Sequence, residues 1–311
     1  MNKPQHSPAA FRRFVQMSKK TGFILVEGKD ADPFFYSQLL RPVCEATGIT
    51  CDILRADFVT GTGGKQALIE LHRYLASTGS LIWQDGGTWK WCIFYLDKDV
   101  DDVMHNLVDS KHIVYTPFYC VENLLFVYGE LVSAAAAASS LDPQDIRERI
   151  PNREEWLRQA AGNWKEFLVL SLLSHRLAVN CECHYGRSTS PINLPPDAPT
   201  SGARFDQIKA ELRTRSGLNE KAFDTKVRAV TRYVECVYRK GLHDVLFNGK
   251  WYYELLRREI NIAAGGKKYS NPPNAALTAA LSLTINFEHP WSGHFREPIR
   301  ELVKTVDSIS N

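Results

Sequence analysis

Short apolar runs and amphipathic stretches alternate in the first part of the chain. Residues 23–26 (FILV) and 91–96 (WCIFYL) contain many β-forming residues and no charged positions, as strands buried on both faces do. Residues 33–40 instead repeat apolar side chains at helical spacing, behind a proline suited to a first helical turn. Residues 51–57 and 112–116 predict two further strands. We therefore expect an α/β fold with a mostly parallel sheet flanked by helices.

The pattern becomes helical after about residue 130. Residues 131–140 (LVSAAAAASS) are alanine-rich and favour a helix, and residues 164–179 carry a broad apolar face. Residues 205–240 follow as expected helices rich in Lys and Arg. We therefore divide the chain into a first domain at 1–130 and a second, largely helical lobe at 131–311.

Acidic residues follow directly after the two apolar runs. Glu27 comes after the first run, and Asp97 and Asp99 come after the second. Open α/β sheets place their chemistry at the carboxyl ends of strands, and alternate residues of an extended strand point to the same side. Three carboxylates gathered there would repel one another unless a cation neutralised them, and Mg²⁺ prefers such oxygen ligands. The alternative is a tight corner and an exposed acidic loop.

These motifs resemble the Toprim fold of topoisomerases, bacterial primases and related nucleases, which carry a Glu after one strand and an Asp-x-Asp after a later one. More closely, the chain is similar to the DUF4435 branch of Toprim-like proteins. The matching segments are VEGKDADPFF, GTGGK, FYLDKD, FYCVENLLF and LFNGKWYYELL. The resemblance covers residues 22–130 and, more loosely, 240–260.

The resemblance implies a metal-dependent endonuclease, with Glu27 as metal ligand or general base and Asp97 and Asp99 as metal ligands. The cofactor would be Mg²⁺, with Mn²⁺ as an alternative. The branch includes the Toprim effector of the PARIS anti-phage system, which implies a toxic effector controlled by an ABC-type ATPase partner, with tRNA favoured over DNA as the target. A homodimer stays open.

The glycine turn at residues 61–65 (GTGGK) does not form a P-loop. In a P-loop, four residues separate the first glycine from a Gly-Lys pair, and a Ser or Thr follows the Lys. Here Gln66 follows Lys65 instead. Any ATP dependence would therefore come from a partner. The turn either is structural or lets a helix N-terminus hold an anion.

Charge is distributed unevenly along the 311 residues. Residues 21–130 contain 15 Asp and Glu against 8 Lys and Arg, whereas residues 204–268 contain 15 Lys and Arg against 8 acids. A basic segment suits a nucleic-acid backbone, and we expect Arg213, Arg228 and Lys250 to contact it; a solvated helix face is the alternative.

Location follows from composition. No run approaches eighteen apolar residues, so no membrane span is expected. The odd number of cysteines, seven, suggests reduced thiols in a cytoplasm.

Two further polar residues are candidates for the site. Glu122 is the one acid within the apolar stretch 118–126, where a carboxylate is costly unless it is paired or liganded. It is either a fourth site carboxylate or part of a helix start. Lys250 is either a phosphate-binding residue or part of a packed helix entry, and packing is favoured for His243 beside it.

A cysteine cluster and two other function classes complete the interpretation. Cys181, Cys183 and His184 have unusual spacing for zinc, so a structural role is favoured. A catalytically silent Toprim-like module that binds nucleic acid or a protein is the main alternative to a nuclease. Topoisomerase or primase chemistry is less favoured, because no tyrosine cleavage domain or zinc ribbon is recognisable.

Overall fold

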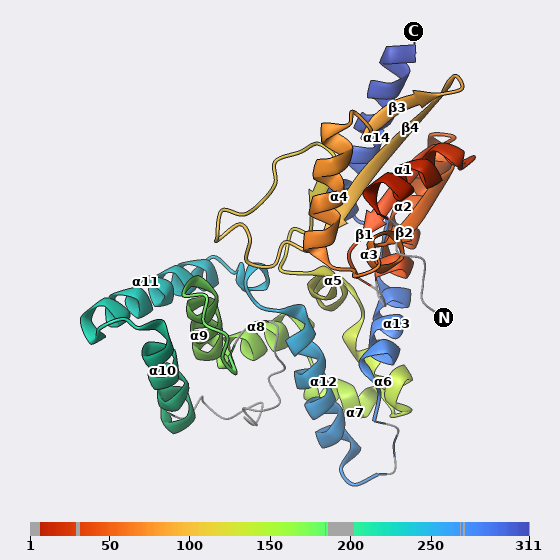
Figure 1. Ribbon diagram of the computed structural model, residues 1–311. Coiled ribbons are helices and arrows are strands. Elements are labelled where there is room, and N and C mark those ends of the chain that lie inside the picture. Colours follow the sequence, from red (N-terminus) through yellow and green to blue (C-terminus); the bar gives the residue numbers. More distant parts are fainter. Residues whose placement is uncertain are drawn as a thin grey trace. The chain divides into compact units, whose positions relative to one another are not determined.

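The computed structural model describes residues 7–28, 32–183, 185, 202–267, 269 and 271–310. The chain divides into two compact units (Figure 1). The sheet unit comprises residues 1–98, 107–116 and 286–311, and the helical unit comprises residues 99–106 and 117–285.

The sheet unit is built on one five-stranded sheet within the described residues. Its strands are β1 (Gly22–Val26), β2 (Cys51–Arg55), β3 (Ile82–Asp85), β4 (Thr88–Leu96) and β5 (Ile113–Tyr115). The order is β2-β1-β4-β3, and β5 pairs with the same edge of β4 as β3 does, farther along. All pairings are parallel except that of β3 with β4. The expected α/β fold with a mostly parallel sheet is confirmed.

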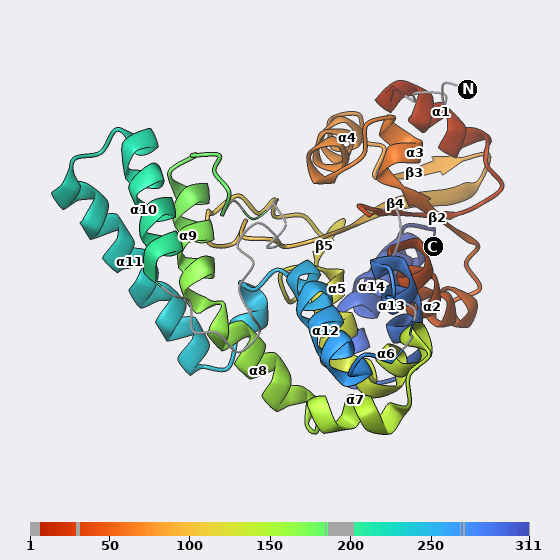
Figure 2. The same ribbon diagram turned by 90° about the horizontal axis from the view of Figure 1, so that it is seen from below.

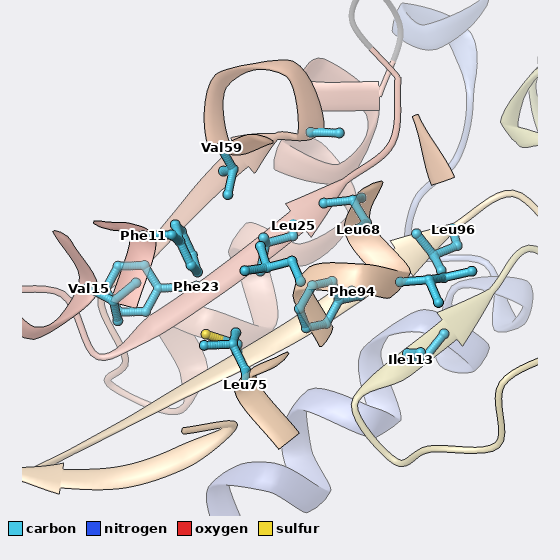
Figure 3. Packing of buried hydrophobic residues seen from close by; sticks show 14 residues of the cluster. Phe11, Val15, Phe23, Leu25, Val59, Leu68, Leu75, Phe94, Leu96 and Ile113 are labelled. Carbon is cyan, nitrogen blue, oxygen red and sulfur yellow. The ribbon is translucent and has the colours of Figure 1, made fainter. Parts of the chain in front are cut away.

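Helices cover both faces of the sheet. They are α1 (Pro8–Met17), α2 (Asp32–Ala46), α3 (Ala56–Thr60), α4 (Lys65–Ser77) and α14 (Gly293–Ser310), with the short 3₁₀ turn η3 (Pro290–Ser292) before α14. Alternate strand residues point to opposite faces, so one face of β1 and β4 presents Phe23, Leu25, Phe94 and Leu96 to α1, α3 and α4 (Figure 3). This cluster is a hydrophobic core of the sheet unit.

The opposite face of the sheet is covered by α2 and α14. The buried rings of Tyr36, Tyr95 and Phe295 contact one another there, and the Tyr95 hydroxyl donates to the Phe295 carbonyl at 2.7 Å. Arg296, 6% exposed, donates from Nε to the Leu39 carbonyl at 2.8 Å. The C-terminal helix therefore belongs to the sheet unit.

The hairpin before the Asp-bearing end of β4 differs from expectation. Residues 84–90 (QDGGTWK) are mostly polar and contain two glycines, which predicts a loop before the Asp-bearing strand, but β3 ends at Asp85 and β4 begins at Thr88, with Gly86 and Gly87 forming the turn at φ 55° and 84°. Lys90, 4% exposed, donates from Nζ to the carbonyls of Val15, Gln16 and Ser18 and pairs with Asp85 at 3.0 Å. It caps the C-terminal end of α1. The prediction failed because the hairpin residues are polar and partly exposed.

The helical unit contains the remaining described helices. They are α5 (Val121–Tyr128), α6 (Leu131–Ser139), α7 (Pro143–Arg149), α8 (Arg153–Asn163), α9 (Lys165–Arg176), α10 (Gly202–Ser216), α11 (Glu220–Arg239), η2 (His243–Val245), α12 (Gly249–Ala264) and α13 (Asn274–Thr284). Helices α9, α10 and α11 lie side by side, and α12 lies among α5, α6, α7 and α8 (Figure 2). The expected largely helical second lobe is present.

The domain boundary differs from the expected one at residue 130. Residues 117–130 belong to the helical unit, because α5 packs against α8, α12 and α13 there. Residues 286–311 belong to the sheet unit, because α14 packs on α2 and β4. The apolar pattern of an isolated helix does not tell which distant partner covers its apolar face.

No single helix among the described residues is long and apolar enough to cross a membrane. Helices α5 and α6 are long and apolar enough only when they are taken together, and the chain bends by 103° between them. Most of their apolar residues are buried in the helical unit.

Candidate active site

Glu27 and Asp97 lie at the carboxyl ends of the neighbouring parallel strands β1 and β4. The register pairs Val26 with Tyr95, so each acid follows the last residues of its strand. The Asp97 backbone N–H donates to Glu27 Oε2 at 3.3 Å, and both side chains are half-buried. Strand order alone therefore brings two acids from distant parts of the sequence together.

A third acid supports the loop after β1. Asp32, 6% exposed, accepts from the Gly28 N–H through Oδ2 at 2.6 Å. A Cβ at position 28 would meet Asp32 Oδ1 at 2.5 Å, which explains the glycine. Burial and the charges of Asp32 and Asp97 hold the pKa of Tyr36 well above its usual range. Tyr36 is therefore a neutral phenol beneath these acids.

Lys65 is a further candidate residue; its position in the sequence predicts only a turn that is structural or lets a helix N-terminus hold an anion. Gly61, Gly63 and Gly64 have φ of 79°, 77° and 87°, a backbone region that favours glycine, and this turn leads directly into α4. The Lys65 Nζ donates to the Lys98 carbonyl at 3.4 Å, one residue beyond Asp97. The turn thus brings a cation to the end of β4. A lysine closing a glycine turn was the available signal.

Asp99 does not lie on the extended end of a strand, although the sequence pattern predicts that it does. Strand β4 ends at Leu96, and Asp99 has a left-handed φ of 53°. It belongs to the helical unit, where its N–H donates to the Tyr119 carbonyl at 2.7 Å. The rule that alternate residues face one side therefore does not apply to Asp97 and Asp99.

The described residues include no group of three or more His, Cys, Asp or Glu side chains that could hold a metal ion. Glu27 and Asp97 nevertheless fit a Mg²⁺ site of another kind. Mg²⁺ is commonly bound through one or two carboxylates, and waters and substrate phosphates complete its shell. The donor set of the sheet unit is therefore compatible with Mg²⁺ that binds together with a phosphate substrate.

In the helical unit, Asn123 rather than Glu122 organises the start of α5. Asn123 is fully buried; its Oδ1 accepts from the N–H groups of Cys120 and Gly249 at 3.2 and 3.1 Å. Its Nδ2 donates to the Phe247 carbonyl at 2.9 Å and to Asp244 Oδ1 at 3.1 Å. The side-chain amide of Asn123 therefore joins two of the segments that carry the family resemblance, FYCVENLLF and LFNGKWYYELL.

Gly249 and Asp244 complete this junction. A Cβ at position 249 would meet the Asn123 backbone nitrogen at 2.5 Å, so only glycine fits. The Tyr252 hydroxyl donates to Asp244 Oδ1 at 3.0 Å, and His243 Nε2 lies 3.3 Å from Asp244 Oδ2. Burial raises the pKa of Asp244 above its usual range, although His243 and these donors oppose the shift. His243 is thus part of this buried junction.

Glu122 and Lys250 face each other near this junction. Glu122 lies in the first turn of α5, its side chain 14% exposed, and Lys250 Nζ lies 3.9 Å from Glu122 Oε1. The Lys250 side chain is 62% exposed, whereas its neighbour Trp251 is buried. Lys250 therefore points toward solvent from a helix whose other side is packed, and it is accessible to a ligand.

The basic segment concentrates its exposed charge on α11. Lys221, Arg228, Arg232 and Arg239 are exposed and follow one another at steps of seven, four and seven residues, which places them along one line of the helix. We call these four residues the basic stripe; it extends over roughly 27 Å of helix. The buried residues Phe223, Val230 and Val234 occupy the opposite face.

The predicted contact residues of the basic segment differ in their surroundings. Arg213, on α10, lies 3.7 Å from Glu220 and so is part of an exposed ion pair. Arg228 is on the basic stripe and donates to the Thr225 hydroxyl at 3.4 Å. Glu235 lies near the stripe and weakens it locally.

The cysteine cluster is only partly described, since His184 lies outside the described residues. The sulfur atoms of Cys181 and Cys183 are 3.0 Å apart, and both side chains are buried. The hydrogen bond from Cys183 lowers the pKa of Cys181 to about 6.

Comparison with known proteins adds no assignment to this geometry. No protein-family model matches the chain, and no curated protein matches its sequence.

Proposed function

We propose that the protein is a Mg²⁺-dependent endonuclease of the Toprim-like kind. The observation that carries the proposal is the Glu27–Asp97 pair at the ends of adjacent parallel strands, joined by a hydrogen bond of 3.3 Å. These two residues would hold Mg²⁺, or Mn²⁺ in its place. Asp99 and Glu122 stay sequence predictions for the same centre.

Each residue has a role in this proposal. A bound Mg²⁺ would activate a water molecule and offset charge on the scissile phosphate. The Asp97 N–H orients the Glu27 carboxylate, which can accept a proton through its other oxygen. Lys65 brings a positive charge to the end of β4, where it can contact a phosphate oxygen.

The substrate and the biological role rest on the basic stripe and on the resemblance. Exposed cations along one helix favour a polyanionic ligand, and the resemblance favours tRNA over DNA. We further propose a cytoplasmic toxic effector of anti-phage defence, restrained by an ABC-type ATPase partner. These assignments come from the sequence motifs.

A second candidate is a catalytically silent Toprim-like module. The exposed cations on α11 favour it, because a line of positive charge can bind a polyanion without any catalytic group. The basic stripe would then serve binding alone.

The deciding experiment is cleavage of total tRNA and of plasmid DNA by the purified protein, with Mg²⁺ and with EDTA. We expect Mg²⁺-dependent cleavage of tRNA that Glu27→Gln abolishes. Glu70→Gln is the matched control, because Glu70 is an exposed carboxylate on α4 of the same unit.

Two results would decide against the nuclease. Equal cleavage by wild type and Glu27→Gln would point to a contaminating enzyme. Binding of tRNA without cleavage, in Mg²⁺ and in Mn²⁺, would establish the silent module.

A further inference from the structure

A cavity of about 420 Å³ opens between α2 and the edge strand β2 of the sheet unit. Its lining combines apolar side chains such as Leu40 and Ile53 with the charged side chains of Arg41 and Glu45. Cys44 and Cys51 both line it. A small solute that enters this cavity therefore meets two thiols.

The two thiols are held against each other by the backbone around them. Cys44 lies near the end of α2 and Cys51 is the first residue of β2, and their sulfur atoms are 2.8 Å apart. The Ile49 N–H donates to the Cys44 carbonyl at 2.9 Å, and the Gly22 N–H donates to the Thr50 carbonyl at 3.1 Å. The connection between the helix and the strand is thus fixed at both ends.

Gly22 makes room for this arrangement. It is paired with Cys51 in the parallel register of β1 and β2. A Cβ at position 22 would lie 2.8 Å from Cys51 Sγ and 2.6 Å from the Trp91 ring. Any side chain there would force the Cys51 sulfur out of its present position.

The pair also has the electrostatic asymmetry that thiol chemistry uses. The hydrogen bond between the sulfurs lowers the pKa of Cys44, although burial opposes the shift, and it raises the pKa of Cys51. The thiolate is the reactive form of cysteine. Cys44 is therefore the better nucleophile, and Cys51 is placed to react second.

We propose that Cys44 and Cys51 form a redox-active pair, which hydrogen peroxide oxidises to a disulfide between α2 and β2. The Cys44 thiolate attacks one peroxide oxygen, the O–O bond breaks, and one water leaves after proton uptake, so that Cys44 becomes a sulfenic acid. Cys51 sulfur then attacks Cys44 sulfur and displaces the second water. Two thiols and one peroxide give one disulfide and two waters.

Peptide mapping of the full-length protein tests this pair directly. Trypsin does not cut between Arg41 and Pro42, so residues 30–55 form one peptide that contains both cysteines. After equimolar peroxide we expect this peptide to lose about 2 Da and to resist alkylation, and dithiothreitol should reverse both changes. In Cys51→Ser, dimedone should label Cys44, because no second thiol remains to convert the sulfenic acid into a disulfide.

The second thiol pair supplies the internal comparison. Cys181 and Cys183 are 2% and 0% exposed. Oxidation of that pair at a lower peroxide dose, or sulfinic acid at Cys44 without a disulfide, would overturn the proposal. The readouts are masses, so neither result depends on the nuclease proposal.

Discussion

The acids at the strand ends of the sheet unit differ in burial and in hydrogen-bond donors from the acid at the helix junction of the helical unit. Glu27 and Asp97 are half-buried, and the bond between them comes from a backbone N–H. Asp244 is buried and accepts from the side chains of Asn123 and Tyr252. Asp244 therefore helps to hold the helix junction together, whereas Glu27 and Asp97 lie half-buried where two parallel strands end. The segments that carry the motif resemblance thus include a pair of acids at strand ends in one unit and a buried helix junction in the other.

The largest expected effect comes from the strand ends. Glu27→Gln and Asp97→Asn should each lower cleavage at least about 100-fold and abolish growth arrest on expression. The melting temperature should be unchanged or raised, because one of two repelling charges is removed. Cleavage assays, growth curves and thermal melts measure this, beside Glu70→Gln. If Glu27→Gln lost the fold together with the activity, Glu27 would have a structural role instead of a catalytic one.

The next effect concerns the junction. Asn123→Ala should lower the free energy of unfolding by about 3 kcal/mol, because it leaves the buried Gly249 N–H and the Phe247 carbonyl without this partner. Urea unfolding measures it. Asn106→Ala is the control, since Asn106 is exposed in the same unit. A loss below about 0.5 kcal/mol would contradict a structural role.

The basic stripe offers an intermediate effect. Arg228→Gln with Arg232→Gln should weaken tRNA binding by about tenfold and flatten the log–log salt slope by roughly 1.4–1.8 units, at about 0.7–0.9 per phosphate contact. The control is Lys226→Gln with Lys240→Gln, which removes the same charge from exposed positions off the stripe. Affinity across a salt series is the measurement. Equal effects in both double variants would mean that net charge alone governs binding.

The smallest expected effect is a pH dependence of stability. The folded pKa of Asp244 is raised, so the folded state holds its proton more tightly than the unfolded state. This contribution is fully present below the unfolded pKa of about 3.9 and is lost as pH rises through the folded pKa, at no more than about 1.4 kcal/mol per pH unit. Asp244→Asn should lack this loss. Parallel pH profiles for wild type and variant would contradict it.

Strands were predictable from sequence where they are buried, and less so where they are polar. The runs at 23–26 and 91–96 gave β1 and the inner part of β4, because a fully buried strand has few polar positions. Strand β3 was missed, since half of it is exposed and its turn glycines resemble a loop.

The candidate site was predictable only in part. The pairing of Glu27 with Asp97 follows from strand ends. Aspartate tolerates a left-handed backbone better than most residues do, but this preference does not single out Asp99 among the neighbouring aspartates. The role of Asn123 depends on residues more than a hundred positions away. Such a contact cannot be read from local periodicity.

The interleaved chain also has a consequence for biosynthesis. Helix α14 covers one face of the sheet, yet the ribosome makes it after all of residues 117–285. Until then Tyr36 and Tyr95 lack the cover of Phe295, so the nascent sheet unit exposes an aromatic surface while the helical unit is already complete. We therefore expect the helical unit to fold first during translation and the aromatic face of the sheet unit to be covered last.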